Sequence, residues 1–78
     1  MNLHEQLEEL CVLLESNGLT SWASRLRDAE YGSTSGEVYM QVGLALNALW
    51  KHRKELPADV RDRTKSLRKD VARMFRTR

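Results

Sequence analysis

The segment from Val38 to Trp50 constrains this chain most, because ten of its thirteen residues are apolar and none is charged. A helix turns about 100° per residue, so side chains three or four positions apart share a face. One face of this helix collects Val38, Val42, Ala45, Leu46, Leu49 and Trp50. A second face carries Met40, Leu44 and Ala48. A helix that is apolar on two sides needs two neighbours, so it is predicted either to be the centre of a bundle or to present a surface that another protein covers.

Two further helices are predicted before this segment. Leucine and cysteine side chains recur at spacings of three and four between Leu3 and Ser16, so a helix is expected there with Asn2 as its N-cap. Gly18 should end it, because glycine tolerates the left-handed conformation that closes a helix. A second helix is expected from Thr20, as its cap, to about Tyr31. Its inner face is formed by Trp22, Ala23, Leu26 and Ala29.

Capping signals bound the last two helices. Thr34 and Glu37 have the spacing of a capping box, so the uncharged helix should begin there and run to about Glu55. Pro57 disfavours helical geometry in the residue before it and suits the first turn of a new helix. The buried seam of that last helix is expected to be Val60, Thr64, Leu67, Val71 and Met74, with Phe75 beside it.

These patterns together predict one all-α domain over residues 1–78, a four-helix, mainly antiparallel bundle with short connections. Trp22 and Trp50 are expected to anchor it, because each can bury a large ring. The predicted core is Leu7, Leu10, Leu14, Trp22, Leu26, Val42, Leu46, Leu49, Leu67 and Val71.

Charge is distributed unevenly along the chain. Residues 1–39 hold two basic and seven acidic side chains, a net charge of −5, whereas residues 40–78 hold eleven basic and four acidic ones, a net charge of +7. The simplest interpretation is that the acidic first helix lies beside the basic last one. Six cationic side chains of the last helix fall within about 140° of the helical wheel. They are Arg61, Lys65, Arg68, Lys69, Arg73 and Arg76.

This basic arc has three interpretations. Lysine and arginine are good helix formers whose stems cover apolar surface, so the arc can be a solvated outer face of the bundle. It can equally meet an acidic protein partner. A third interpretation is a nucleic-acid site, in which each cation contacts a phosphate; the modest overall charge of +2 and the lack of aromatic residues on this face speak against it.

Few side chains suggest chemistry. His4 and Glu8 lie one helical turn apart and are expected to form a solvated pair, and His52 should lie at the surface. Cys11 has no basic neighbour in sequence that would lower the pKa of its thiol, so it is expected to be a small core residue. No acid pair, nucleophile triad or set of metal ligands can be assembled. We therefore predict no enzymatic activity, cofactor, metal or small-molecule ligand.

The same features indicate a compartment. No apolar run approaches the ~20 residues of a membrane span, and the first residues lack the basic and then apolar character of a signal peptide. A single cysteine, Cys11, cannot form an internal disulfide and fits a reducing environment. A cytoplasmic protein without membrane association is expected.

One spacing pattern resembles a known group of proteins. Leu7, Leu10 and Leu14, followed by Gly18 and by the second-helix face that begins at Trp22, resemble the opening of short uncharacterised bacterial helical proteins, some of them encoded in toxin and immunity neighbourhoods. The pattern covers about a third of the chain. The resemblance implies a bacterial protein-binding role, in which an immunity-type protein covers the surface of a toxin, and it assigns no site residue.

The sequence therefore predicts a small protein-interaction module that self-associates. The predicted interface is Met40, Leu44 and Ala48, helped by the small Gly43 and by Asn47, and a two-fold homodimer is favoured because one patch can then meet itself. The alternative is a nucleic-acid-associated protein that uses the basic arc. A central helix covered on both sides would remove the reason for self-association.

Overall fold

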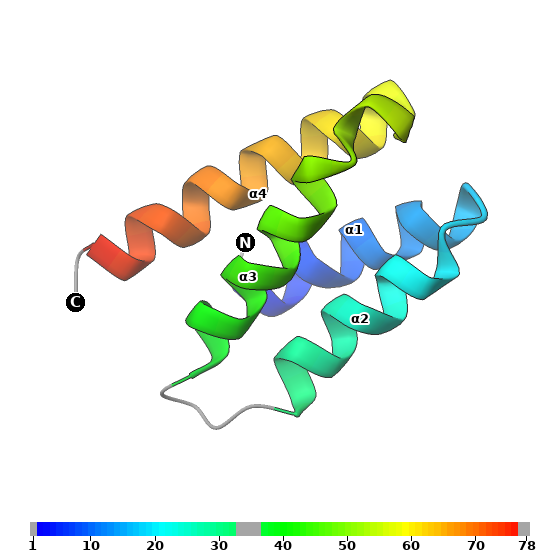
Figure 1. Ribbon diagram of the computed structural model, residues 1–78. Coiled ribbons are helices and arrows are strands. Elements are labelled where there is room, and N and C mark those ends of the chain that lie inside the picture. The colour runs from blue at the N-terminus through cyan, green and yellow to red at the C-terminus, as the bar shows by residue number, and fades with distance from the viewer. Residues whose placement is uncertain (1, 33–36, 77–78) are drawn as a thin grey trace.

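The structure, a computed structural model, describes residues 2–32 and 37–76, the last two of these by their backbone alone. Its elements are α1 (Leu3–Ser16), α2 (Thr20–Tyr31), α3 (Val38–Lys51), the 3₁₀ turn η1 (Arg53–Glu55) and α4 (Ala58–Arg76). Each helix runs antiparallel to the one before it (Figure 1). The predicted all-α, four-helix bundle is confirmed.

The four helices form a ring of contacts. The main packing partners of α1 are α2 and α4, and those of α3 are also α2 and α4. Helices α1 and α3 therefore occupy diagonal corners, with α3 at the front of the bundle in Figure 1 and α1 behind it. It follows that the outer faces of α1 and α3 are turned to opposite sides of the molecule.

The ends of α1 follow the predicted capping chemistry. The side-chain Oδ1 of Asn2 accepts a hydrogen bond of 2.9 Å from the backbone N–H of Glu5. This bond satisfies one of the amides that the first helical turn leaves without a partner. At the other end Gly18 has φ +74°, a left-handed conformation that side chains with a Cβ rarely adopt. Both predictions are confirmed.

The start of α2 differs from the prediction by one residue. Thr20 is the first helical residue, and the N-cap is Leu19, whose side chain makes no capping hydrogen bond. The backbone N–H of Leu19 donates to the carbonyl of Leu14 at 2.8 Å, which closes the turn after α1 and leaves the Leu19 carbonyl to accept from Ala23 at 3.3 Å. The predicted cap at Thr20 is wrong, because the turn places the carbonyl of Leu19 where it accepts the first helical hydrogen bond and Thr20 is already inside the helix.

The boundaries of α3 also differ from the prediction. Glu37 is its N-cap rather than its third helical residue, and Thr34, the other half of the predicted capping box, lies outside the described residues. The helix ends at Lys51, and the chain tightens into η1 instead of continuing helically to Glu55. Leu56 is extended, with ψ 143°, as expected for a residue that precedes proline.

The core lies where the four apolar faces meet. Nine of the ten predicted core residues are buried, and Leu10, Leu14 and Leu49 are fully buried. Thr64 is the one buried polar residue among those described, and its hydroxyl donates to the carbonyl of Val60 at 2.8 Å, so no polar group is stranded there. Five further buried residues lie on helix faces that the sequence predicted to point inward, namely Leu3, Cys11, Ala23, Ala45 and Val60. The burial of Leu56 was not predicted.

Trp22 is the predicted core residue that is only half-buried. Ala23 and Leu26 take the inner positions of α2, so the indole, one residue away from Ala23, points to the edge of the bundle. There its ring lies 5.4 Å from that of His52, centroid to centroid, and 5.1 Å from the guanidinium carbon of Arg25. The prediction that Trp22 anchors the interior is wrong, although its ring still packs against the core.

We predict that Leu10→Ala or Leu49→Ala lowers the free energy of unfolding by about 2 to 5 kcal/mol, because each leaves a cavity among fully buried neighbours. Chemical denaturation would measure the loss. Val12→Ala is the matched control, since Val12 is 54% exposed on the same helix as Leu10, and its change should stay within about 0.5 kcal/mol. A loss below about 0.5 kcal/mol for either leucine would contradict the assigned core.

Candidate protein-interaction surface

The second apolar face of α3 is left exposed by the described residues of the chain. Leu44 is 59% exposed and Met40 is 46% exposed, while Ala48 is half-buried. The opposite face of the same helix supplies Val42, Ala45, Leu46 and Leu49 to the core. Helix α3 therefore has two neighbours on its inner side, and no described helix lies over Met40 and Leu44. The structure excludes the arrangement in which α3 is covered on both sides by the described helices.

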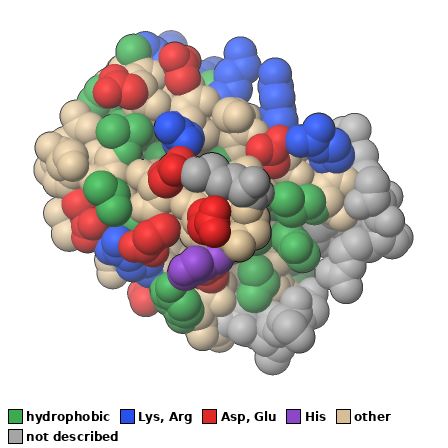
Figure 2. Space-filling model, turned by 180° about the vertical axis from the view of Figure 1, so that it is seen from behind, with side chains coloured by type: hydrophobic (Ala, Val, Ile, Leu, Met, Phe, Trp, Pro, Cys, Tyr) green, Lys and Arg blue, Asp and Glu red, His purple; other side chains and the backbone are tan. Residues whose placement is uncertain are grey.

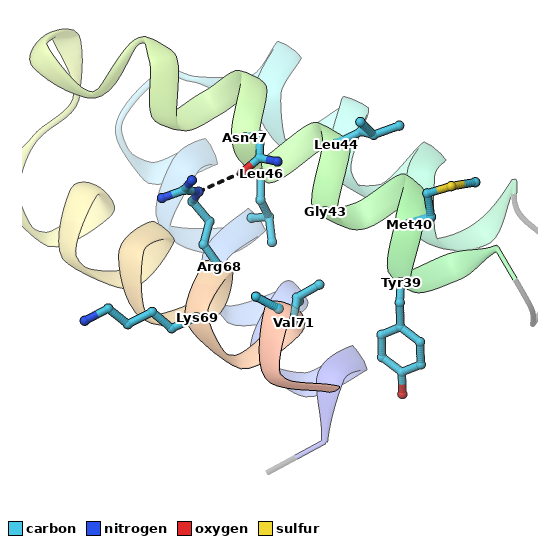
Figure 3. Close-up of a pocket in the computed structure, with 10 residues that line it drawn as sticks. Tyr39, Met40, Gly43, Leu44, Leu46, Asn47, Arg68, Lys69 and Val71 are labelled. Carbon is cyan, nitrogen blue, oxygen red and sulfur yellow. Dashed lines mark hydrogen bonds between the residues drawn. The ribbon is translucent and has the colours of Figure 1, made fainter. Parts of the chain in front are cut away.

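A groove of about 530 Å³ runs between α3 and α4 beside this face. The side chains of Leu46 and Val71 approach each other at its floor, whereas Met40 and Leu44 point outward at its rim (Figure 3). A Cβ built on Gly43 would lie 3.8 Å from Val71, an ordinary van der Waals contact, so Gly43 faces α4 across the groove. We call this hollow the α3/α4 groove. Its apolar floor and the exposed face of α3 form one continuous surface.

Arg68 and Lys69 of α4 give this groove a cationic edge. The Nε of Arg68 donates to the Oδ1 of Asn47 at 2.9 Å, drawn as the dashed line in Figure 3. Asn47, which the sequence placed beside the predicted interface, is exposed and is bonded to α4. No carboxylate is among the described residues that line the groove.

The indole of Trp50 lies next to this edge. The guanidinium carbons of Arg53 and Arg68 each lie 5.2 Å from the centroid of its ring, within the range of a cation–π interaction. Leu49 takes the fully buried position, so the neighbouring Trp50 is only half-buried. The prediction that Trp50 is a core anchor is wrong. Its ring instead lies beside the basic arc, a face that was predicted to lack aromatic residues.

The basic arc itself is mixed in exposure and pairing. Lys65, Lys69 and Arg73 are exposed, while Arg61 and Arg68 are half-buried. Arg73 forms an ion pair with Asp70 on the same helix. The side chain of Arg76 lies outside the described residues.

Charges on α1 are largely paired within the bundle. Arg63 of α4, which lies outside the predicted arc, contacts Glu9 at 2.6 Å, so the expected approach of the basic last helix to the acidic first one is confirmed. Arg27 of α2 contacts Glu8 at 2.6 Å and Glu15 at 2.7 Å. The hydrogen bond that Arg27 donates to Glu15 holds the pKa of the Glu15 carboxyl below the usual range.

The sequence predicted that His4 pairs with Glu8, but the structure shows a different partner. The Nδ1 of His4 lies 3.0 Å from the Oε2 of Glu30 on α2, because the contact between the first two helices brings these side chains together. No three described His, Cys, Asp or Glu side chains are placed to hold a metal ion. No described helix is both long and apolar enough to cross a membrane.

A second groove, of about 630 Å³, runs along the outer face of α1 and reaches α4 only at Arg63. Apolar side chains of Val12 and Leu13 lie in it beside the carboxylates of Glu5, Glu8 and Glu9. We call it the α1 face. Figure 2 shows the molecule from this side, with carboxylates spread among apolar side chains. This site was not predicted from the sequence, although Val12 interrupts an otherwise polar face of the helix and could have signalled it.

Cys11 is buried between α1 and α2, 1% exposed, with its thiol 3.6 Å from the carbonyl of Ala23. Desolvation by this apolar environment raises the pKa of the thiol to about 11. The thiolate, which is the nucleophilic form, is therefore scarce at neutral pH. The prediction of a small core residue is confirmed.

Comparison of the chain with protein-family models, with curated proteins and with solved structures found no match. Its function is therefore inferred from the surfaces described above.

We predict that a thiol reagent labels Cys11 of the native protein at pH 7 at least ~100-fold more slowly than it labels the unfolded protein, because labelling requires opening of the core. Colorimetric thiol assays with and without denaturant would measure both rates. The labelling rate should rise in variants with destabilised cores such as Leu10→Ala. Rapid, complete labelling of the native chain would contradict the burial of this residue.

Proposed function

We propose that this protein is a small interaction module that self-associates through the exposed face of α3. The observation that carries the proposal is the exposure of Met40 and Leu44, 46% and 59%, on a helix without a charged side chain before Lys51. Scattered apolar side chains are common on protein surfaces. Here they adjoin a groove with an apolar floor, and contiguous apolar surface of this kind is typical of protein-binding sites.

The chemistry of the face also favours a protein as its partner. Methionine adapts its shape to different partners, and leucine supplies area without a hydrogen-bonding requirement. The half-buried Ala48 lets another backbone approach closely at the end of the stripe. The smallest assembly that covers the face is a homodimer. Its association should strengthen a core that is thin in a chain of 78 residues.

The resemblance of the first third of the chain to bacterial helical proteins extends this proposal to its biological setting. An immunity-type protein acts in the cytoplasm by covering part of another protein, which requires complementary shape and charge but no catalysis. The exposed face of α3, with its cationic edge, suits that role.

The alternative, nucleic-acid binding through the basic arc, has less support. Arg73 is paired with Asp70, and Arg68 is held by Asn47 and Trp50. Lys65 and Lys69 are the exposed cations of the arc that no described ion pair occupies. A protein that follows a phosphate backbone usually offers more such contacts.

We predict that the wild-type protein shows a rise in average mass with concentration, to about twice the monomer mass or more, and that Leu44→Glu abolishes the rise. A glutamate placed in an apolar contact would have to be desolvated there without a partner. Light scattering between about 10 μM and 1 mM would measure the mass. Circular dichroism should show that Leu44→Glu remains helical, because the side chain is exposed in the monomer.

The matched control is Ser21→Glu, which adds the same charge at an exposed position in the first turn of α2, where the helix dipole favours it. It should associate as the wild type does. A wild-type protein that stays monomeric at 1 mM, or a Leu44→Glu variant that simply unfolds, would contradict the proposal.

A further inference from the structure

We infer that the occupant of the α3/α4 groove is the α1 face of a second copy of this chain, so that copies associate head to tail. The inference rests on the proposed self-association and adds to it the surface that the partner contributes. It replaces the two-fold pairing favoured by the sequence with a contact between two different surfaces. Both surfaces are present on every copy.

Charge complementarity is the first argument. The α3/α4 groove is edged by Arg68 and Lys69, and its described lining includes no carboxylate. The α1 face is lined by three glutamates and by one arginine, Arg63 of α4, and it therefore carries an excess of negative charge. Opposite charges at the edges of two apolar surfaces favour their encounter and fix their relative orientation.

Glu5 is the carboxylate on the α1 face best placed to meet a second copy. Glu8 and Glu9 already contact Arg27 and Arg63 within the same chain. Glu5 is exposed in the first turn of α1, and its carboxylate is in no ion pair among the described residues. Lys69 is likewise exposed and is in none of the described ion pairs. A contact between Glu5 of one copy and Lys69 of the next would therefore use charges that the monomer leaves in solvent.

Apolar complementarity is the second argument. Val12 is 54% exposed on the α1 face, and Leu13 lies half-buried beside it. Met40 and Leu44 project at the rim of the other groove (Figure 3). These three exposed side chains, Val12, Met40 and Leu44, are with Tyr31 the large apolar residues that the described part of the chain leaves exposed. A head-to-tail contact covers all of them but Tyr31, whereas a two-fold contact between α3 faces leaves Val12 in water.

A two-fold contact also has an electrostatic cost. It would bring Arg68 and Lys69 of both copies to one interface, where like charges repel. In the head-to-tail contact each cationic edge meets an acidic surface instead. Because α1 and α3 are turned to opposite sides of the bundle, a pair of copies retains one open surface of each kind. Growth beyond two copies is expected at high concentration.

The decisive experiment mixes two variants, each with one surface blocked. Leu44→Glu blocks the α3/α4 groove, and Val12→Glu blocks the α1 face with the same kind of substitution at a similarly exposed position. In a head-to-tail assembly each variant alone should be monomeric. Their equimolar mixture should form a one-to-one complex, about twofold heavier than the monomer, that does not grow further. Analytical ultracentrifugation at about 1 mM total protein would separate these species.

The outcomes separate failure of this inference from failure of the proposed function. If wild-type protein associates but Val12→Glu does so equally, the partner surface is not α1 and the inference is wrong, whereas self-association stands. The inference is equally wrong if both variants are monomeric and their mixture is too. If wild-type protein never associates, the proposed function itself fails. Circular dichroism must show that both variants are folded. If the added charge near Glu8 unfolds the helix in Val12→Glu, Val12→Ser replaces it as the variant that blocks the α1 face.

Salt provides an independent test of the charge pairing. The head-to-tail association should weaken several-fold between about 0.05 and 0.5 M NaCl, because exposed ion pairs are screened. The variants Glu5→Lys and Lys69→Glu should each self-associate more weakly than the wild type. Mixing them should restore association, because the new lysine at position 5 of one variant can meet the new glutamate at position 69 of the other. Association that is unchanged or strengthened by salt would overturn the charge argument.

Discussion

The structure depends on the burial of one side of α3. This helix has no charged residue before Lys51, and its inner side chains, including the fully buried Val42, Leu46 and Leu49, meet α2 and α4. Hydrophobic burial is the dominant stabilising term in a small domain, and a chain of this length has few helices with which to provide it. Helices α2 and α4 cover one side of α3, and the described residues leave the other side exposed.

Some charged side chains around this core join helices of the bundle to one another, and others remain exposed to solvent. Arg27 and Arg63 contact glutamates of α1, so they join helices to one another within the bundle. Lys65 and Lys69 remain exposed on α4. Exposed ion pairs contribute little to stability, whereas complementary surface charge is effective in orienting association. Under the proposed self-association, the asymmetry in charge along the sequence matters more for contacts between molecules than for the fold.

The presence of the four helices and most of the core residues could be predicted from the sequence, because both depend on the local spacing of apolar side chains. The cap at Asn2, the left-handed Gly18 and nine of the ten core positions follow from such spacing. The sequence-based prediction failed for Trp22 and Trp50, since one residue along a helix rotates a side chain by about 100° and only the packed neighbours decide which residue points inward. The outward direction of Met40 and Leu44 could be predicted, but the groove beside them and the role of Arg68 required α4 to be placed.

In the head-to-tail association inferred above, the α3/α4 groove of one copy meets the α1 face of the next. Methyl NMR spectra recorded over a dilution series would test it most directly, because methyl groups report on their own surroundings without any substitution. If copies associate head to tail, the signals of Met40, Leu44 and Val12 should shift together with concentration, while those of the buried Leu10 and Leu49 stay fixed. Signals of Val12 that do not move while those of Met40 and Leu44 do, or spectra independent of concentration, would contradict it.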